Sequence, residues 1–168
     1  MIKDSGTRQT FESGAVRDVE DFKGRCDLLP LGVIGDIYDS NLGVGDTTGE
    51  VFYCISEYQK TGNTEWLYGA LSAFLNIPNA PFTCWADMWL EVAIHFEEGA
   101  KKYGEYNWQK GIPTKRYINS AVRHYLKWLR GDEDEPHHRA FVWNILACCW
   151  TSENKPECED YGEEGGEK

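Results

Sequence analysis

The chain has 168 residues, enough for one domain with a continuous core. Its 28 acidic and 17 basic residues give a formal charge of −11, which disfavours binding to a nucleic-acid polymer or an anionic membrane. At 41% hydrophobic and 14% aromatic residues, it has too much apolar surface for a disordered protein. Its apolar runs are shorter than the roughly 20 residues that cross a bilayer, so no membrane span is expected.

The first residues, from Met1 to Gly6, lack the apolar core of a signal peptide, so we expect a cytoplasmic protein. The six cysteines include no Cys-x-x-Cys pair, which is the spacing that zinc ribbons and redox motifs need. We therefore expect free thiols.

The first half of the chain predicts an arm followed by two helices. Residues 1–30 are polar and contain Gly6, Gly14 and Gly24, which predicts a long arm of loop and turn. Residues 31–46 are rich in glycine and predict at most one short helix. Apolar residues then recur at helical spacing over 48–59 and 64–75.

Three more helices are predicted in the second half. They span 83–103, 114–130 and a segment that begins after the acidic turn 132–136 and runs to about Thr151. No segment shows the alternating apolar pattern of paired strands. The expected fold is all-α, a bundle of about five helices with a long N-terminal loop arm.

The charge is unevenly distributed along the sequence. Residues 153–168 hold seven acids and two lysines, which predicts a disordered acidic tail. Residues 1–152 then carry 21 acids against 15 bases, and 14 of these bases lie within 1–30 or 101–139. Two explanations of the basic blocks stay open, namely charge pairing between helices and a binding site for a small anion.

Two segments have spacing that suits a metal ion. In the helix predicted over 83–103, Glu91, His95 and Glu98 share one face. The spacing of His95 and Glu98 recurs in Glu135 and His138, and two such helices can surround a hard ion, with magnesium or manganese favoured. Two explanations without a metal stay open. The polar face of the helix over 83–103 is then a solvated surface, and the acids of 132–135 stabilise the N-terminus of the next helix.

The helix predicted over 114–130 carries a polar stripe that includes Arg123 and Lys127, beside His124. An amphipathic surface helix would show the same pattern. Asn144 has apolar neighbours and needs hydrogen-bond partners, either backbone groups or a ligand. There is no phosphate-binding loop and no Gly-x-Ser-x-Gly elbow, which leaves metal-assisted attack by water as the favoured chemistry.

Eight sequence blocks occur in order in the two basic parts of the chain. They are Gly6 to Arg8, Ser13 to Asp18, Lys23 to Pro30, His95 to Gly104, Asn107 to Gly111, Ser120 to His124, Gly131 to Glu135, and His138 to Asn144. As a set, they resemble the phage-type dATP/dGTP diphosphohydrolase family. That family is similar to the MazG-like all-α nucleotide pyrophosphohydrolases, which cleave a nucleoside triphosphate between its α and β phosphates with magnesium or manganese.

The resemblance implies a single MazG-like helical domain over residues 1–152, with 31–80 as an insertion that the family lacks. It implies hydrolysis of a purine nucleotide, dGTP or dATP, to monophosphate and pyrophosphate. It also implies a homo-oligomer, a dimer or tetramer, located in the host cytoplasm if the protein is phage-encoded.

The resemblance also implies the site residues. The metal ligands would be Glu91, Glu97, Glu98, Asp134, Glu135 and His138, with Glu98 and Glu135 as the catalytic pair. The substrate would contact Arg17, Lys23, Arg25, Lys101, Lys102, Tyr103, Asn107, Trp108, Arg123, His124 and Asn144.

The chain departs from the MazG-like pattern, because the usual Glu-x-x-Glu and Glu-x-x-Asp pairs appear here as His95-x-x-Glu98 and Glu135-x-x-His138. An alternative function is therefore a phage-encoded sponge that sequesters a cyclic or modified nucleotide immune signal without hydrolysis and without a metal. A structural bundle with solvated polar stripes is the third hypothesis.

Overall fold

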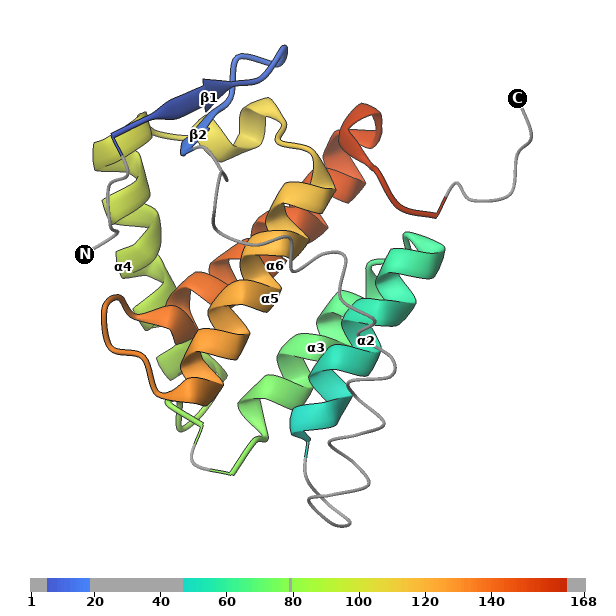
Figure 1. The fold of residues 1–168 in the computed structure, drawn as a ribbon, viewed down its shortest axis with the longest axis vertical. Helices are drawn as coiled ribbons and strands as arrows, with labels where there is room; N and C mark the ends of the chain where they lie inside the picture. Colours follow the sequence, from blue (N-terminus) through green and yellow to red (C-terminus); the bar gives the residue numbers. More distant parts are fainter. Residues whose placement is uncertain (1–5, 19–46, 79, 163–168) are drawn as a thin grey trace.

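The computed structural model describes residues 6–18, 47–78 and 80–162. Within these ranges, five α-helices make up the bulk of the fold (Figure 1), which confirms the predicted all-α class. They are α2 (Thr48–Thr61), α3 (Glu65–Leu75), α4 (Trp85–Tyr103), α5 (Thr114–Arg130) and α6 (His137–Asn154). The smaller elements are the strands β1 (Arg8–Thr10) and β2 (Val16–Asp18) and the 3₁₀ helices η2 (Asn107–Lys110) and η3 (Pro156–Cys158).

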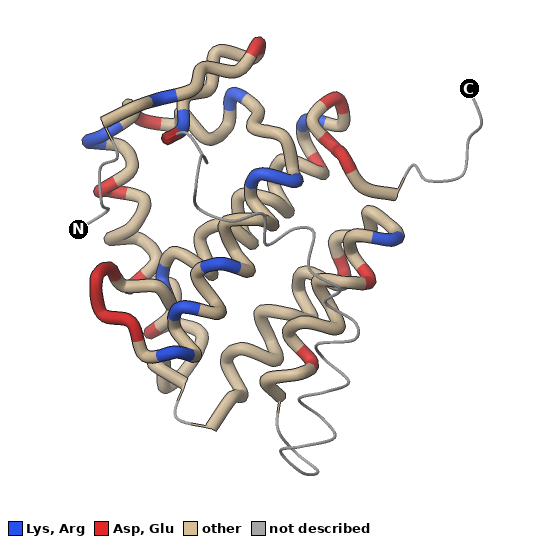
Figure 2. The backbone as a smooth tube through the Cα atoms, viewed as in Figure 1, with Lys and Arg blue, Asp and Glu red and all other residues tan. Residues whose placement is uncertain are grey.

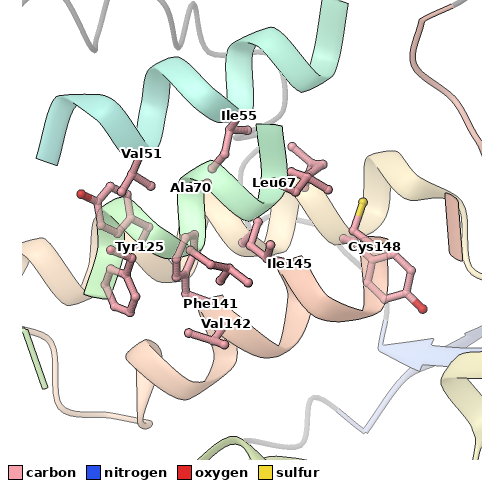
Figure 3. Packing of buried hydrophobic residues seen from close by; sticks show 14 of the residues in the cluster. Val51, Ile55, Leu67, Ala70, Tyr125, Phe141, Val142, Ile145 and Cys148 are labelled. Carbon is pink, nitrogen blue, oxygen red and sulfur yellow. The ribbon is translucent and has the colours of Figure 1, made fainter. Parts of the chain in front are cut away.

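Helix α6 is the centre of the bundle. It packs against α3, α4, α5 and η2, with the α2–α3 pair on one side and α4 on the other (Figure 1). Apolar residues occur around most of its circumference, as expected of a helix that neighbours cover on several sides. Figure 3 shows Val51 and Ile55 of α2 and Ala70 of α3 near Phe141 and Ile145 of α6.

The aromatic part of the core is built around Phe74. Its ring lies 4.7 Å from that of Phe141, 5.0 Å from Trp128 and 5.9 Å from Tyr125, in tilted or edge-on arrangements. Aromatic pairs prefer such geometries, and each pair contributes about 0.5–1.5 kcal/mol beyond its area burial. These rings join α3 to the α5–α6 pair.

The helix boundaries follow local chemistry. Helix α5 spans the predicted residues, and Gly131 ends it in the left-handed conformation that glycine tolerates best. Helix α4 begins two residues later than predicted, because the Thr83 backbone N–H and hydroxyl both donate to Asp87 and hold Thr83 before the first turn. Helix α6 continues three residues past Thr151.

The N-terminal arm contains a hairpin, so the expectation of loop and turn alone is wrong for this part. Strand β1 pairs antiparallel with β2, with Arg8 opposite Asp18 and Thr10 opposite Val16. Strands of three residues are too short to show a readable alternation, which is why the sequence pattern missed them. Residues 31–46, where at most one short helix was expected, lie outside the described residues, as do residues 19–30.

The expected disordered tail from residue 153 is wrong for residues 153–162. The half-buried Glu159 carboxylate accepts hydrogen bonds from Tyr58 Oη at 2.8 Å and from Thr114 Oγ1 at 2.9 Å. The Tyr161 ring packs edge-on against Tyr58, 5.5 Å away. An acidic composition favours disorder on average, but here one carboxylate joins the ends of α2 and α5. Residues 163–168 lie outside the described residues.

Two simpler expectations can also be compared with the structure. Cys54, Cys84, Cys148, Cys149 and Cys158 are free thiols, as predicted, while Cys26 lies outside the described residues. Among the described residues, none of the helices has the length and apolar character needed to span a bilayer.

The Glu159 contacts give a matched test of the C-terminal segment. We expect Glu159→Gln to lower the free energy of unfolding by about 1–3 kcal/mol, because the charged acceptor of the Tyr58 and Thr114 hydroxyls is lost. Glu157→Gln, at a side chain that is 66% exposed, should change it by less than about 0.5 kcal/mol. Urea unfolding of both variants measures the difference, and equal stabilities would refute the packed arrangement of this segment.

Candidate functional site

A pocket of about 870 Å³ lies between the hairpin, α4, η2, α5 and α6. This volume is in the range of small-molecule sites, about 300–1,000 Å³. Ten of the predicted site residues line it, namely Arg17, Glu97, Tyr103, Asn107, Trp108, Arg123, His124, Asp134, Glu135 and Asn144. Predicted residues from distant parts of the sequence therefore meet at one place.

Asn107 attaches the hairpin to the helical body. Its Oδ1 accepts from the Val16 backbone N–H at 3.1 Å, and its Nδ2 donates to the Val16 carbonyl at 2.9 Å. The Ser13 hydroxyl adds a hydrogen bond to the Gly111 carbonyl. Asn107 was predicted to bind the substrate, but its amide is used to position β2.

Arg17 is held over the pocket by Asn144. Its Nη2 donates to Asn144 Oδ1 at 2.6 Å, and its guanidinium lies over the rings of Tyr117 and Trp143, at 5.3 and 5.9 Å from their centroids. Asn144 Nδ2 donates to the Ala140 carbonyl one turn back in α6. The buried asparagine thus uses one backbone partner and one functional side chain.

The two lysines predicted from α4 are paired with acids and do not line the pocket. Lys102 Nζ lies 2.8 Å from Asp18, which also accepts from Tyr103 Oη at 2.9 Å. Burial alone would lower the pKa of Lys102, but Asp18 and Tyr103 raise it above its usual value, so the ammonium stays charged. Lys101 pairs with Glu97 at an exposed position. Lys23 and Arg25 lie outside the described residues.

Helix α5 contributes two cations to the pocket, Arg123 and Lys127. Arg123 Nη2 donates to Ser120 Oγ at 2.7 Å, whereas its buried Nη1 has no hydrogen-bond partner within the described part of the chain. Lys127 Nζ lies 3.1 Å from Asp134. Figure 2 shows these bases along α5 and the acidic turn 132–135 beside them. The pocket wall therefore combines fixed positive charge with carboxylates.

Two histidines and two acids form a connected cluster at this wall. His137 Nε2 lies 2.8 Å from Asp134 Oδ1, and His137 Nδ1 lies 3.0 Å from His124 Nδ1. Glu135 Oε1 is 3.6 Å from both Nδ1 atoms. His137 lowers the pKa of Asp134 to about 2, with help from Lys127, so this carboxylate is ionised. Burial keeps the pKa of His124 well below its usual value, with Arg123 adding to the effect.

The six predicted metal ligands do not converge on one point. Arg139 lies 3.8 Å from Glu91 and 3.6 Å from Glu98, so its guanidinium bridges the two carboxylates. His138 packs edge-on against Phe82, with ring centroids 5.4 Å apart. Among the described residues, the groups that could hold a metal ion are His124 with Glu135 and His137, and Asp132 with Asp134 and His137. Of the six predicted metal ligands, these groups contain Asp134 and Glu135.

Several pocket features escaped the sequence-based prediction. Asp18 lines the pocket and was not named from the sequence. His95 and Lys127, which were named for their faces but not as site residues, line it as well, and burial together with Arg139 and Arg17 lowers the pKa of His95 to about 3. His137 was passed over in favour of His138. Asp134 and His137 are three residues apart, and this short separation was the local signal for their contact across the start of α6.

Residues 83–161 match the family model described as dATP/dGTP diphosphohydrolase, N-terminal. The matched segment contains α4, α5 and α6. It also contains every lining residue of the pocket except Val16, Arg17 and Asp18 of β2. No curated protein and no solved structure matches the chain.

The Asn107 contacts predict a local effect. We expect Asn107→Ala to speed hydrogen exchange of the Val16 amide, because Asn107 Oδ1 is its acceptor. Lys110→Ala, at an exposed position of the same 3₁₀ helix, should leave that exchange unchanged. Exchange followed by mass spectrometry tests this, and equal rates in the two variants would show that the hairpin is held by other contacts.

Proposed function

We propose that this protein is a metal-dependent nucleotide diphosphohydrolase. The reason is that residues 83–161 match the dATP/dGTP diphosphohydrolase N-terminal family. Its substrate would be a purine deoxynucleoside triphosphate, dGTP or dATP, and its products the monophosphate and pyrophosphate. The observation that carries the proposal is the pocket of the matched segment, where fixed cations lie beside ionised carboxylates. Phosphoryl chemistry needs both kinds of group in one place.

Arg17 and Arg123 would bind the triphosphate. Both guanidinium groups line the pocket, and each is oriented by a neutral side chain, Arg17 by Asn144 and Arg123 by Ser120. Guanidinium groups bind phosphate oxygens through paired hydrogen bonds, so both side chains suit a triphosphate. Lys127 would add a third positive charge, which its ion pair with Asp134 partly balances.

Aromatic residues near the ends of α4 and η2 would hold the base. The Trp108 ring already packs against Phe96 at 5.4 Å and Trp150 at 5.0 Å. Tyr106 lines the pocket and is 66% exposed. We therefore favour Tyr106, beside Tyr103, as the surface on which a purine stacks.

The residues at the pocket wall fit a divalent cation. Glu135 supplies a carboxylate and His124 supplies a neutral imidazole, which are ligand types that manganese and related ions accept. Glu91 and Glu98 fit less well, because Arg139 already balances their charge. When bound, such an ion would polarise a phosphate oxygen and lower the pKa of the attacking water.

Of the two residues predicted as catalytic, Glu135 is the better placed. It lines the pocket, where its carboxylate can accept a proton from water, whereas Glu98 contacts Arg139 and is not among the lining residues. Arg17 and Arg123 would meanwhile offset the negative charge that develops on the departing pyrophosphate.

We also propose that the chain self-associates through α4. Trp85, Trp89, Leu90 and Ile94 of this helix are 40–72% exposed and together cover about half of its circumference. The rings of Trp85 and Trp89 stack at 5.5 Å. An exposed apolar stripe of this kind is typical of an interface, and a second copy supplies a matching stripe.

The enzymatic proposal predicts release of pyrophosphate from dGTP or dATP in the presence of magnesium or manganese. Glu135→Gln should lower kcat by about 100-fold or more, because the proton acceptor at the pocket wall is lost. Glu133→Gln, in the same turn but outside the pocket lining, should keep the wild-type rate. Chromatography of the products measures both.

Two outcomes would overturn this function. One is intact nucleotide after incubation with concentrated protein, and the other is equal hydrolysis by the wild type and Glu135→Gln. Tight nucleotide binding that chelator does not weaken, with the nucleotide recovered intact, would identify a binding protein instead.

Self-association has its own test. Leu90→Lys should shift the molar mass measured by light scattering towards that of one chain, because a buried charge disfavours the interface. Tyr53→Lys, at a comparably exposed aromatic residue of α2, should not. A wild type that is monomeric at high concentration would rule out this interface.

A further inference from the structure

We propose that His124, His137 and Glu135 form a three-ligand site for a divalent transition-metal ion, with Asp134 fixing the orientation of one imidazole. The residue set differs from the six metal ligands expected from the sequence, of which it contains only Glu135. The proposal of a metal site does not depend on whether the protein hydrolyses a nucleotide. Only the role of its bound ion towards a phosphate rests on the proposed function.

The distances between the donor atoms suit such an ion. His124 Nδ1 and His137 Nδ1 are 3.0 Å apart, and Glu135 Oε1 is 3.6 Å from each. A point equidistant from three atoms with these separations lies about 2.0 Å from each, which matches first-row metal bonds to imidazole nitrogen and carboxylate oxygen of about 2.0–2.2 Å. The three atoms therefore need little movement to bind one ion. The proton that His124 Nδ1 donates to His137 Nδ1 in the metal-free protein moves to His124 Nε2 or to water when the ion binds.

Asp134 determines which nitrogen of His137 is available. Its Oδ1 lies 2.8 Å from His137 Nε2, and an ionised carboxylate can only accept, so His137 Nε2 carries the proton. In a neutral ring, Nδ1 then carries the lone pair, and this atom faces His124 and Glu135. Metal-bound histidines usually donate their other N–H to a carboxylate in this way.

The positions of the three residues also suit a functional site. His137 is buried, with 1% of its side chain exposed, while His124 and Glu135 are 13% and 15% exposed and line the pocket. One side of the ligand group is thus held rigidly and the other faces the pocket. Three protein ligands with access to a cavity are typical of catalytic metal sites, where water or substrate completes the coordination.

The ligand types indicate which metals bind. Two imidazole nitrogens favour manganese, iron, cobalt, nickel or zinc, whereas magnesium prefers oxygen ligands in a nearly ideal octahedron. The site should therefore select transition-metal ions over magnesium.

The test is a titration of metal-free, full-length protein with Co²⁺ in the absence of nucleotide. We expect one ion per chain, visible d–d absorption from the bound cobalt, and affinity for Mg²⁺ that is lower by about 100-fold or more. His124→Asn, His137→Asn and Glu135→Gln should each remove the absorption. Asp134→Asn should weaken Co²⁺ binding by about 10- to 100-fold.

The neighbouring His138 provides the control. His138→Asn changes the same residue type one position along α6, and it should leave the cobalt spectrum unchanged because this side chain packs against Phe82. Loss of the spectrum in this variant, with retention in His137→Asn, would overturn the assignment.

A measurement on the wild type avoids any effect of substitution on folding. Imidazole ¹⁵N spectra should show Zn²⁺-dependent shifts at Nδ1 of His124 and His137. If Zn²⁺ causes no such shifts but the protein hydrolyses dGTP in the presence of magnesium, the metal site is overturned and the proposed function is supported. The shifts without any hydrolysis would support the site and refute the function.

Discussion

The packing of α6 against α5 is the constraint on which the rest of the molecule depends. Their shared apolar surface includes Tyr125 and Phe141, whose rings lie 5.2 Å apart in the core. The same packing brings His124 of α5 to His137 of α6 and places Arg123 and Asn144 at one pocket. Because one interface builds both the core and the α5–α6 wall of the pocket, that wall is as rigid as the core beneath it.

The sequence predicted the helices well and the ends of the chain poorly, for physical reasons. Helical periodicity is a local signal, and α5 spans the expected residues. The hairpin depends on Asn107, which lies about 90 residues from Val16, and the C-terminal segment depends on Glu159 reaching Tyr58. No local pattern in the sequence reports contacts of this range.

The candidate site was predicted in part for the same reason. Spacing placed Glu91 and Glu98 on one face of α4, but it could not show that Arg139 of α6 would face both carboxylates. Charge pairing accounts for part of the basic blocks in the structure. Lys101 and Lys102 pair with acids, while Arg17 and Arg123 line the pocket. Lys101 pairs with Glu97 of its own helix, whereas the partner of Lys102 is Asp18 of β2, which local spacing could not show.

The attachment of the hairpin has a consequence for the timing of ligand exchange. Two strands of three residues are marginally stable alone, and the amide of Asn107 holds their inner edge. Arg17 belongs to the same strand, β2, so detachment of the hairpin would remove one cation and one wall of the pocket while the helices stay folded. We expect the residence time of a bound nucleotide to follow this local opening, which costs far less free energy than global unfolding.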